Sequence, residues 1–320
     1  MPMSMQAISF KPVYMQRVWG GRELENIFGR KPPFPETPYG EAWEMTDRPN
    51  EQSIVSDGPF IGSSLHELWK NHRDEIFGQG FEDSRRFPLL LKILDARDKL
   101  SIQVHPPAEI AADLGGEPKT EMWYIADAMP GAKLYVGLKA GITKADFERA
   151  IDSGTVDQVV HCITPKAGDS IIIPSGRLHA IGAGLLIYEI QQNSDTTYRV
   201  FDWNRLGLDG QPRELHVAES LRCIDFSDIE PQMDKVEAST LASCPYFRVE
   251  RLDLSGGSIL ENPEPDRFSI VTVISGELCS DDGTKYGAGD FLLLPRNANA
   301  LTASSQSTVL QTSIPHDSQG

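Results

Sequence analysis

Short apolar runs separated by turn residues constrain the fold of this chain more than any other feature of its sequence. Such runs include FPLLLKILDA from Phe87, EMWYIADA from Glu121 and GLLIYEIQQ from Gly184. They are rich in Leu, Ile and aromatic residues, and Gly, Pro or Asp residues lie between them at short spacing. Many short strands with such turns predict a mainly β protein, folded as a sandwich or a barrel.

One short unit occurs twice in the chain. GDSIIIPSGRLHA begins at Gly168 and GDFLLLPRNANA begins at Gly289, and each has Gly-Asp, four largely apolar positions and then Pro. The repetition indicates that the two halves are divergent copies of one β unit. Ala300 occupies the position of His179, so the second copy does not perform the role of that histidine.

Helical periodicity is scarce and predicts only a few short helices. The strongest candidates are residues 63–78, which open with serine caps, and residues 143–154, which have a Thr cap and a Gly stop. Two smaller candidates cover residues 108–116 and 214–224. The first candidate predicts a helical insertion at about residues 63–80 of the first copy.

The domain boundary is predicted in an acidic, poorly periodic stretch at residues 226–244, after which strand-like runs resume. We therefore expect a catalytic domain over residues 1–235, which carries the helical insertion, and a degenerate second domain over residues 236–320.

The charge balance limits the partners of the chain. With 30 Lys and Arg against 46 Asp and Glu, its formal charge is -16, which repels phosphate backbones and anionic membranes. Nucleic acid and membrane are therefore not expected as partners, and an anionic substrate would need a local cluster of Arg or Lys. The four cysteines form no Cys-x-x-Cys pair, and no secretory or membrane-spanning segment is evident. These features predict a cytoplasmic protein.

Four polar residues have the types and spacing of a metal site. Gln103 and His105 are two residues apart and would share one face of a strand. Glu121 begins a largely apolar strand, where a carboxylate is costly unless it is paired or bound to a cation, and His179 ends the first repeat unit. Each could be a structural residue on its own. Together, two imidazoles, a carboxylate and an amide oxygen suit Zn²⁺ with an open coordination position.

Long motifs give the chain a specific resemblance. The spacing from Gly168 through Pro174 and Gly176 to His179 matches the second motif of the cupin superfamily. FPLLLKILDARDKLSIQVHPP, KTEMWYI, GDSIIIPSGRLHAIGAG and YEIQQNSDTTYRVFDWNR, with VWGGREL and RELHVAESL, closely resemble type I mannose-6-phosphate isomerases of the short bacterial form. The resemblance covers most of residues 10–225 and, more loosely, the second copy. It implies two tandem cupin jelly-roll barrels, with short helices in or around the first.

The resemblance also implies an activity and a cofactor. Members of this family interconvert D-mannose 6-phosphate and D-fructose 6-phosphate through a cis-enediol intermediate, so the expected partner is a small-molecule sugar phosphate. The family's zinc ligands fall on Gln103, His105, Glu121 and His179, which implies one Zn²⁺ per chain.

Catalytic and substrate-binding residues follow from the same resemblance. Glu189 and Arg199 match residues that line the family's pocket, and Lys119 matches the lysine of the family's Lys-x-Glu. Glu189 could transfer the proton or could be a structural partner of Arg199 or Lys119. Arg199 could bind the phosphate or neutralise the enediolate, and Lys119 could be a proton shuttle or stabilise an oxyanion. Ser101 and Arg205 are predicted phosphate contacts.

Some features depart from the family pattern, and other functions stay open. Pro107 and Ala108 follow Pro106 where the family often has Pro-Asp, which leaves the ligands in place but affects substrate preference. An isomerase of another sugar or sugar phosphate, and a non-catalytic sugar-binding cupin, are the alternatives. We expect a monomer or a weak homodimer.

Overall fold

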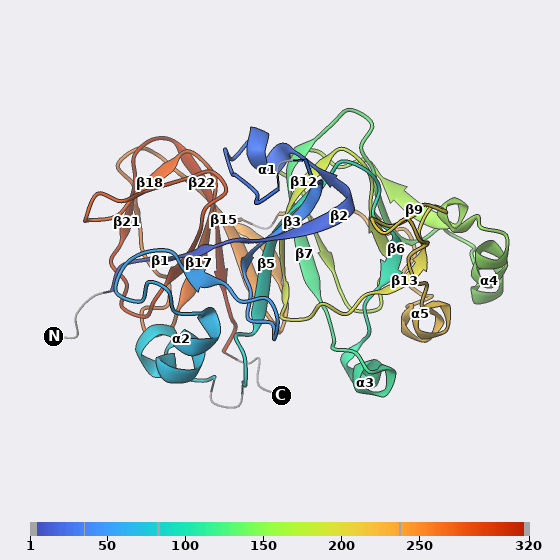
Figure 1. The fold of residues 1–320 in the computed structure, drawn as a ribbon, viewed down its shortest axis with the longest axis horizontal. Coiled ribbons are helices and arrows are strands. Elements are labelled where there is room, and N and C mark those ends of the chain that lie inside the picture. The colour runs from blue at the N-terminus through green and yellow to red at the C-terminus, as the bar shows by residue number, and fades with distance from the viewer. Residues whose placement is uncertain (1–4, 35, 82–83, 237, 317–320) are drawn as a thin grey trace. The chain divides into compact units, whose positions relative to one another are not determined.

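The computed structural model describes residues 5–34, 36–81, 84–236 and 238–316 (Figure 1). Strands predominate over short helices, which confirms the prediction of a mainly β protein. Among the described residues, no helix has the length and apolar character that crossing a bilayer requires.

The chain divides into two compact units, and each is discontinuous in sequence. One contains residues 14–42 and 92–234, and the other contains residues 1–13, 43–91 and 235–320. Residues 1–13 and 43–91, which include the predicted helical insertion, thus group with the C-terminal segment. The assignment of residues 1–235 to one catalytic domain stays a prediction about function.

The unit that contains residues 92–234 is built on two antiparallel sheets. The larger has the order β10 (Ser170–Ile173), β7 (Glu121–Ala128), β12 (Leu185–Gln192), β5 (Leu89–Ala96), β2 (Val13–Gly21) and β3 (Tyr39–Met45). The smaller has the order β13 (Tyr198–Phe201), β6 (Ile102–Val104), β11 (His179–Ile181), β8 (Leu134–Leu138) and β9 (Val160–Ile163). One core cluster joins Trp123 and Ile171 of the larger sheet with Val136 and Ile181 of the smaller, so the sheets pack face to face.

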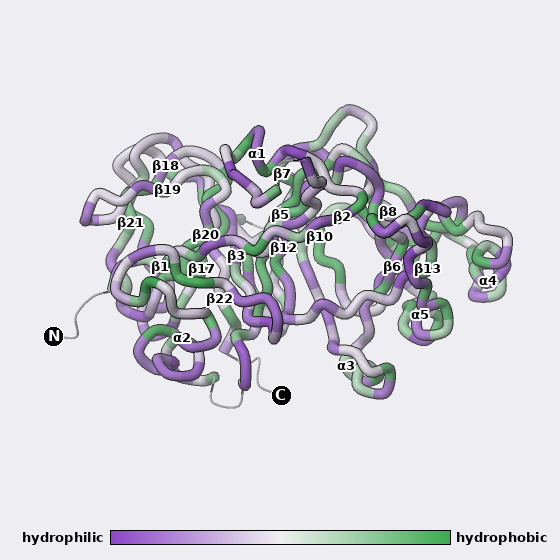
Figure 2. The backbone as a smooth tube through the Cα atoms, in the orientation of Figure 1, coloured by the Kyte–Doolittle hydropathy of each residue, from purple (hydrophilic) through white to green (hydrophobic). Residues whose placement is uncertain are grey.

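The second unit repeats this plan with different side chains. Its larger sheet has the order β14 (Thr240–Ser243), β15 (Arg248–Leu254), β22 (Ser307–Ser313), β17 (Ser269–Ser275), β20 (Phe291–Leu294), β1 (Ile8–Lys11) and β4 (Ile54–Val55). Its smaller sheet has the order β16 (Ile259–Leu260), β21 (Leu301–Ala303), β18 (Glu277–Cys279) and β19 (Lys285–Gly287). Figure 2 shows hydrophobic segments in strands of both units, such as β10 and β17, alternating with hydrophilic stretches, and the buried apolar side chains form a core in each unit.

The two sheet orders correspond strand by strand. The run β10-β7-β12-β5 matches β20-β17-β22-β15, and β6-β11-β8-β9 matches β16-β21-β18-β19. Gly176 and its counterpart Asn297 both have positive φ, 89° and 52°, in the turn after the repeated proline, a conformation that Gly and Asn adopt most readily. The internal repeat read from the sequence is thus also a repeat of topology.

The predicted helices are confirmed, although most are shorter than the sequence pattern. They are α2 (Leu65–Asn71) with a π-helical turn at Arg73–Phe77, α3 (Ala108–Ala111) with a 3₁₀ turn at Ala112–Leu114, α4 (Lys144–Asp152) and α5 (Val217–Cys223). Ser64 with Glu67 and Thr143 with Asp146 form capping boxes at the starts of α2 and α4. A one-turn helix, α1 (Glu23–Asn26), and a 3₁₀ turn at Val156–Gln158 were not predicted.

Asp47 is a buried hydrogen-bonding centre of the unit that contains α2. Its carboxylate accepts bonds from the Phe87 amide at 2.9 Å, from Arg86 at 2.8 Å and from Gln52 at 2.9 Å, and it lies 3.1 Å from His66 Nδ1. Burial works to raise the pKa of Asp47, but the hydrogen bonds from Gln52, Phe87 and His66 lower it overall.

We expect Asp47→Ala to lower the free energy of unfolding by about 3 kcal/mol at pH 7, because the buried Phe87 amide and several partly buried donors lose a charged acceptor. The folded-state pKa lies below the unfolded value of 3.8, so this stabilisation is present above about pH 4 and is lost as the pH falls further. Denaturant unfolding at pH 7 and at pH 3 measures both effects. Asp281→Ala, at an exposed aspartate of the same unit, is the control, and equal stability of the two variants would contradict the expectation.

Candidate active site and metal centre

Three of the four predicted ligands converge in the unit that contains residues 92–234. One potential ligand atom from each of His105, Glu121 and His179 lies within 4.8 Å of the others, and all three side chains are buried. His105 follows β6, Glu121 begins β7 and His179 begins β11. Because β6 and β11 are paired with Gln103 opposite His179, residues 76 positions apart meet on adjacent strands.

Both imidazoles are oriented by backbone carbonyls. Nδ1 of His105 donates to the Thr196 carbonyl at 2.9 Å, and Nδ1 of His179 donates to the Arg177 carbonyl at 2.9 Å. These bonds leave each Nε2 without a proton and close to Glu121, at 3.4 Å for His105 and 3.6 Å for His179. This is how metal-binding histidines are usually held, with the second nitrogen fixing the tautomer and the ring.

The protonation states suit cation binding. Burial, and next the charge of Lys119, lowers the pKa of His105 to about 3, and burial also lowers the pKa of His179. Burial alone would raise the pKa of Glu121, but Lys119 and the two histidines hold it well below its usual range. At neutral pH the group is therefore two neutral imidazoles and one carboxylate, the forms that ligate metals.

Glu121 has few protein partners for a buried carboxylate. Neither oxygen accepts a well-directed hydrogen bond from the described residues, and the closest cation is Lys119 Nζ, 2.6 Å from Oε2. A buried carboxylate whose lone pairs are not satisfied by hydrogen bonds is costly unless a cation is close. The donor set of His105, Glu121 and His179 therefore fits a bound divalent cation.

Gln103 lies at the same place but presents its amide nitrogen. Gln103 Nε2 is 3.3 Å from His179 Nε2, while Gln103 Oε1 accepts from Ser101 Oγ at 3.1 Å. Ser101, Gln103 and His105 thus lie on one side of the β6 segment, as the alternation of the sequence predicts. The amide would have to turn over before its oxygen could ligate a metal.

A cavity of about 560 Å³ adjoins this cluster within the same unit. Its walls include five predicted site residues, namely Ser101, Gln103, Lys119, Glu189 and Arg199. Lys119 and Gln103 are also in contact with His105 and His179, respectively. A small polar molecule in this cavity would therefore lie next to the three clustered side chains.

Glu189 is held in the cavity wall by two donors. Trp123 Nε1 donates to Glu189 Oε2 at 3.0 Å, and Lys92 Nζ lies 3.2 Å from Oε1. Lys119 is more distant from this carboxylate, at 4.0 Å, so Lys92 is its main charged partner. Burial, and next the charge of Glu121, raises the pKa of Glu189. For Lys92, the effect of burial is outweighed by Glu189 and Glu41, so its pKa is raised and it stays charged.

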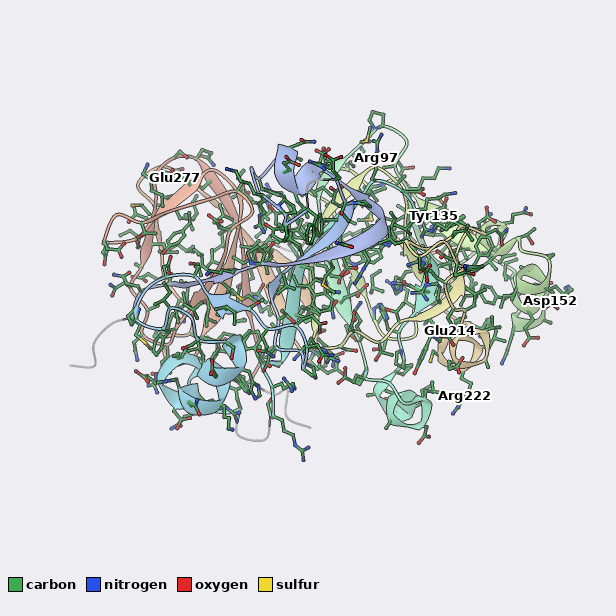
Figure 3. The ribbon with its side chains drawn as sticks, in the orientation of Figure 1. Arg97, Tyr135, Asp152, Glu214, Arg222 and Glu277 are labelled. Atoms are coloured by element: carbon green, nitrogen blue, oxygen red, sulfur yellow. The ribbon has the colours of Figure 1, made fainter. Side chains whose placement is uncertain are left out.

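Arg199 lies on β13, which pairs with the strand that carries Gln103. It is the register partner of Gln103 across β13 and β6, and its Nε is 3.3 Å from Ser101 Oγ. Its Nη1 donates to the carbonyl of Glu214 at 2.8 Å, on the segment before α5 where Figure 3 labels Glu214. These contacts place the guanidinium beside the strand that carries Gln103.

Arg205 is the one predicted catalytic or substrate residue that does not line the cavity. Its guanidinium faces Asp202, with Nη2 at 2.9 Å from Oδ1, and it also lies 3.5 Å from Asp98. Arg213 shares the Asp202 carboxylate, donating from Nε to Oδ2 at 2.7 Å, and it does line the cavity. The predicted phosphate contact of Arg205 stays a prediction.

The structure adds residues that the sequence reasoning did not single out. Lys92 and Glu41 are almost fully buried and line the cavity, and Glu41 accepts from Arg17 Nε at 2.6 Å. A sequence signal existed for Lys92, since a lysine within the apolar run LLLKILDA is unusual unless it is paired. Arg17 and Arg213 carried no comparable signal, because arginines in polar segments are common.

Comparisons with known proteins agree in one family. Residues 8–122 match the model of the phosphomannose isomerase type I catalytic domain. Mannose-6-phosphate isomerase ManA of Bacillus subtilis is 40% identical over 305 residues, which cover 92% of this chain and 94% of the relative. Mannose-6-phosphate isomerase of Streptococcus mutans is 37% identical, with 89% and 92% covered.

A solved structure agrees over nearly the whole length. The crystal structure of the mannose 6-phosphate isomerase from Bacillus subtilis superposes with a TM-score of 0.86 at 34% identity, covering 97% of this chain and all of the other. Full-length identity of this level, the family model and the common fold lead to one conclusion. The chain belongs to the type I phosphomannose isomerase family.

Proposed function

We propose that this protein is a zinc-dependent isomerase that interconverts D-mannose 6-phosphate and D-fructose 6-phosphate through a cis-enediol intermediate. The observation that carries the proposal is the convergence of His105, Glu121 and His179 beside a cavity whose walls hold Lys119, Glu189 and Arg199. The relatives bear the name of this enzyme. The substrate is a small sugar phosphate.

The metal site consists of His105, Glu121 and His179, with Gln103 as fourth ligand once its amide oxygen is turned inward. We assign one Zn²⁺ to it, because two neutral imidazoles and a carboxylate in a closed, buried set suit this ion. A bound Zn²⁺ supplies Lewis-acid polarisation of substrate oxygens at the carbons that exchange a proton.

Glu189 is the proposed proton-transferring group. Its carboxylate is buried and faces the cavity, and Trp123 and Lys92 fix its orientation. The raised pKa makes it a stronger base than an exposed carboxylate, while Lys92 keeps the anionic form accessible. Such a group can take the proton from C2 of the aldose and return it to C1.

Arg199 and Lys119 are the proposed stabilisers of negative charge. Arg199 lies beside Gln103 and Ser101, so it is close to the atoms that change charge rather than only to a distant phosphate. Lys119 Nζ lies within 3.2 Å of His105 Nε2 and 4.0 Å of Glu189 Oε1. Fixed cations at these positions stabilise an enediolate more than the neutral sugar, which accelerates the reaction.

The two units are proposed to be tandem cupin jelly rolls, of which only one is catalytic. The matching strand orders support this assignment. Cytoplasmic location and a monomer or weak homodimer remain predictions.

His105→Ala and His179→Ala should each lower Zn²⁺ affinity at least 100-fold and abolish isomerase activity, because each removes one of few ligands. Metal content after dialysis, together with a coupled assay of mannose 6-phosphate turnover, tests this. His72→Ala is the matched control, since this histidine belongs to the other compact unit, where its 39% exposed side chain contacts Glu75 and the Phe60 ring. Full metal content and normal turnover in both ligand variants would disprove the site.

Glu189→Gln should lower kcat about 1,000-fold with the metal retained, because the amide cannot exchange the proton. The wild-type kcat/KM should rise with pH as Glu189 ionises, at a higher pH than for an ordinary carboxyl, and this limb should vanish in the variant. Incorporation of solvent deuterium into the product sugar measures proton transfer directly. Wild-type deuterium incorporation in Glu189→Gln would assign the proton transfer to another group.

A further inference from the structure

The cations around the cavity differ in how exposed their side chains are. Lys92 and Lys119 have side chains only 5% exposed, and each lies against a buried carboxylate, Glu189 or Glu121. Arg17 and Arg213 also line the cavity, but their side chains are 27% and 22% exposed. We call the part of the cavity with the two nearly buried lysines its inner end, since Lys119 contacts Glu121 and His105, and the part with the two more exposed arginines its outer part.

This division matches the two ends of an open-chain hexose 6-phosphate. If C1 and C2 react beside His105, Glu121 and His179, C6 and its phosphate lie four carbons farther from the cluster. Arg199 is tied to the inner end by its pairing with Gln103 and its contact with Ser101. The phosphate therefore needs other cations, and the more exposed arginines of the cavity wall are available for it.

Arg213 is fixed in orientation by a buried carboxylate. Its Nε donates to Asp202 Oδ2 at 2.7 Å and its Nη2 to Oδ1 at 2.5 Å, so Asp202 occupies one edge of the guanidinium. Nη1 makes no hydrogen bond to any residue that the structure describes. Arg205 binds the same Asp202 without lining the cavity, so it supports Arg213 indirectly.

Arg17 is held by a carboxylate of the cavity wall and by a backbone carbonyl, since its Nη1 donates to the Gln16 carbonyl at 3.2 Å. Its Nε donates to Glu41 Oε1 at 2.6 Å, and Glu41 Oε2 lies 3.7 Å from Lys92. Burial, and next the charges of Arg213, Arg17 and Arg205, lowers the pKa of Arg199 despite the opposing effect of Asp202. The arginines are therefore close enough to repel one another, and a bound anion would relieve that repulsion.

We propose that Arg17 and Arg213 form the phosphate subsite of the cavity, with Glu41 and Asp202 as their positioning residues. The subsite determines the preference for a phosphorylated sugar over a neutral one. Arg205 supports the subsite through Asp202, and Arg199 is left to the enediolate. The inference rests on the proposed function, because it takes the reacting carbons to lie at the metal cluster.

Arg17→Gln and Arg213→Gln test the subsite in the zinc-loaded protein. Each should raise KM for mannose 6-phosphate about tenfold and weaken competitive inhibition by inorganic phosphate by a similar factor, with kcat changed less than about threefold. The kcat/KM for unphosphorylated mannose should not change. Arg222→Gln is the matched control, since it removes the same charge from an exposed position on α5 of the same unit (Figure 3).

Arg213→Lys separates recognition from folding. It keeps a charge next to Asp202 but lacks the planar fork, so it should fold and still weaken phosphate inhibition.

Unchanged phosphate inhibition in Arg17→Gln and in both Arg213 variants would overturn the inference. Equal losses of kcat/KM for mannose and for mannose 6-phosphate would also overturn it. If wild-type protein binds phosphate through these arginines but does not isomerise the sugar phosphate, the proposed function fails and the subsite stands. If the protein isomerises mannose 6-phosphate and its KM is unchanged in Arg17→Gln and Arg213→Gln, the proposed function stands and the subsite fails.

Discussion

The burial of carboxylates that must stay charged is the constraint on which the catalytic unit depends. Glu121 and Glu189 are 1% and 4% exposed, and removing such charges from water costs several kcal/mol each unless opposite charges are close. Lys119 and Lys92 provide those charges at 2.6 and 3.2 Å. A network of alternating charges therefore lines the inner cavity, and its geometry is set by the pairing of β7 with β12, in which Trp123 lies opposite Glu189. The same strands that form the core thus orient the reactive groups.

The strand register also shows which residues of the second copy correspond to the carboxylates of the first. Glu121 lies opposite Ile173 in the first copy, and Ser269 lies opposite the equivalent Leu294 in the second. Gln311 lies opposite Val271 where Glu189 lies opposite Trp123. With Ala300 in place of His179, the second copy has neutral residues at three corresponding positions. Removing the charges also removes the need for compensating cations, so that copy can keep an apolar core around Leu292 and Leu294.

The sequence predicted that His105, Glu121 and His179 would lie together, because strand alternation and motif spacing are local properties. Gln103 and His105 had to share a face, and the turn after Pro174 had to return the chain near them. The grouping of residues 43–91 with the C-terminal segment was not predictable in this way, because it depends on pairings between strands far apart in the chain. Likewise, Arg205 and Arg213 look alike in sequence. Which of them faces the cavity depends on how both bind Asp202, a tertiary property that no local pattern encodes.

The net charge of -16 determines how the cations of the cavity must recognise a sugar phosphate. A protein with this charge repels a sugar phosphate at long range, so recognition must come from short-range contacts within a Debye length of the site. Cations that are already neutralised by buried carboxylates contribute little net attraction to a dianion. Arg17 and Arg213 also have carboxylate partners, but a carboxylate has two oxygens whereas a guanidinium has five donors. An arginine can therefore be held by one carboxylate and still bind an anion, which a lysine in a tight buried pair cannot do as well. The distribution of Lys at the reacting end and Arg at the outer end follows from this difference.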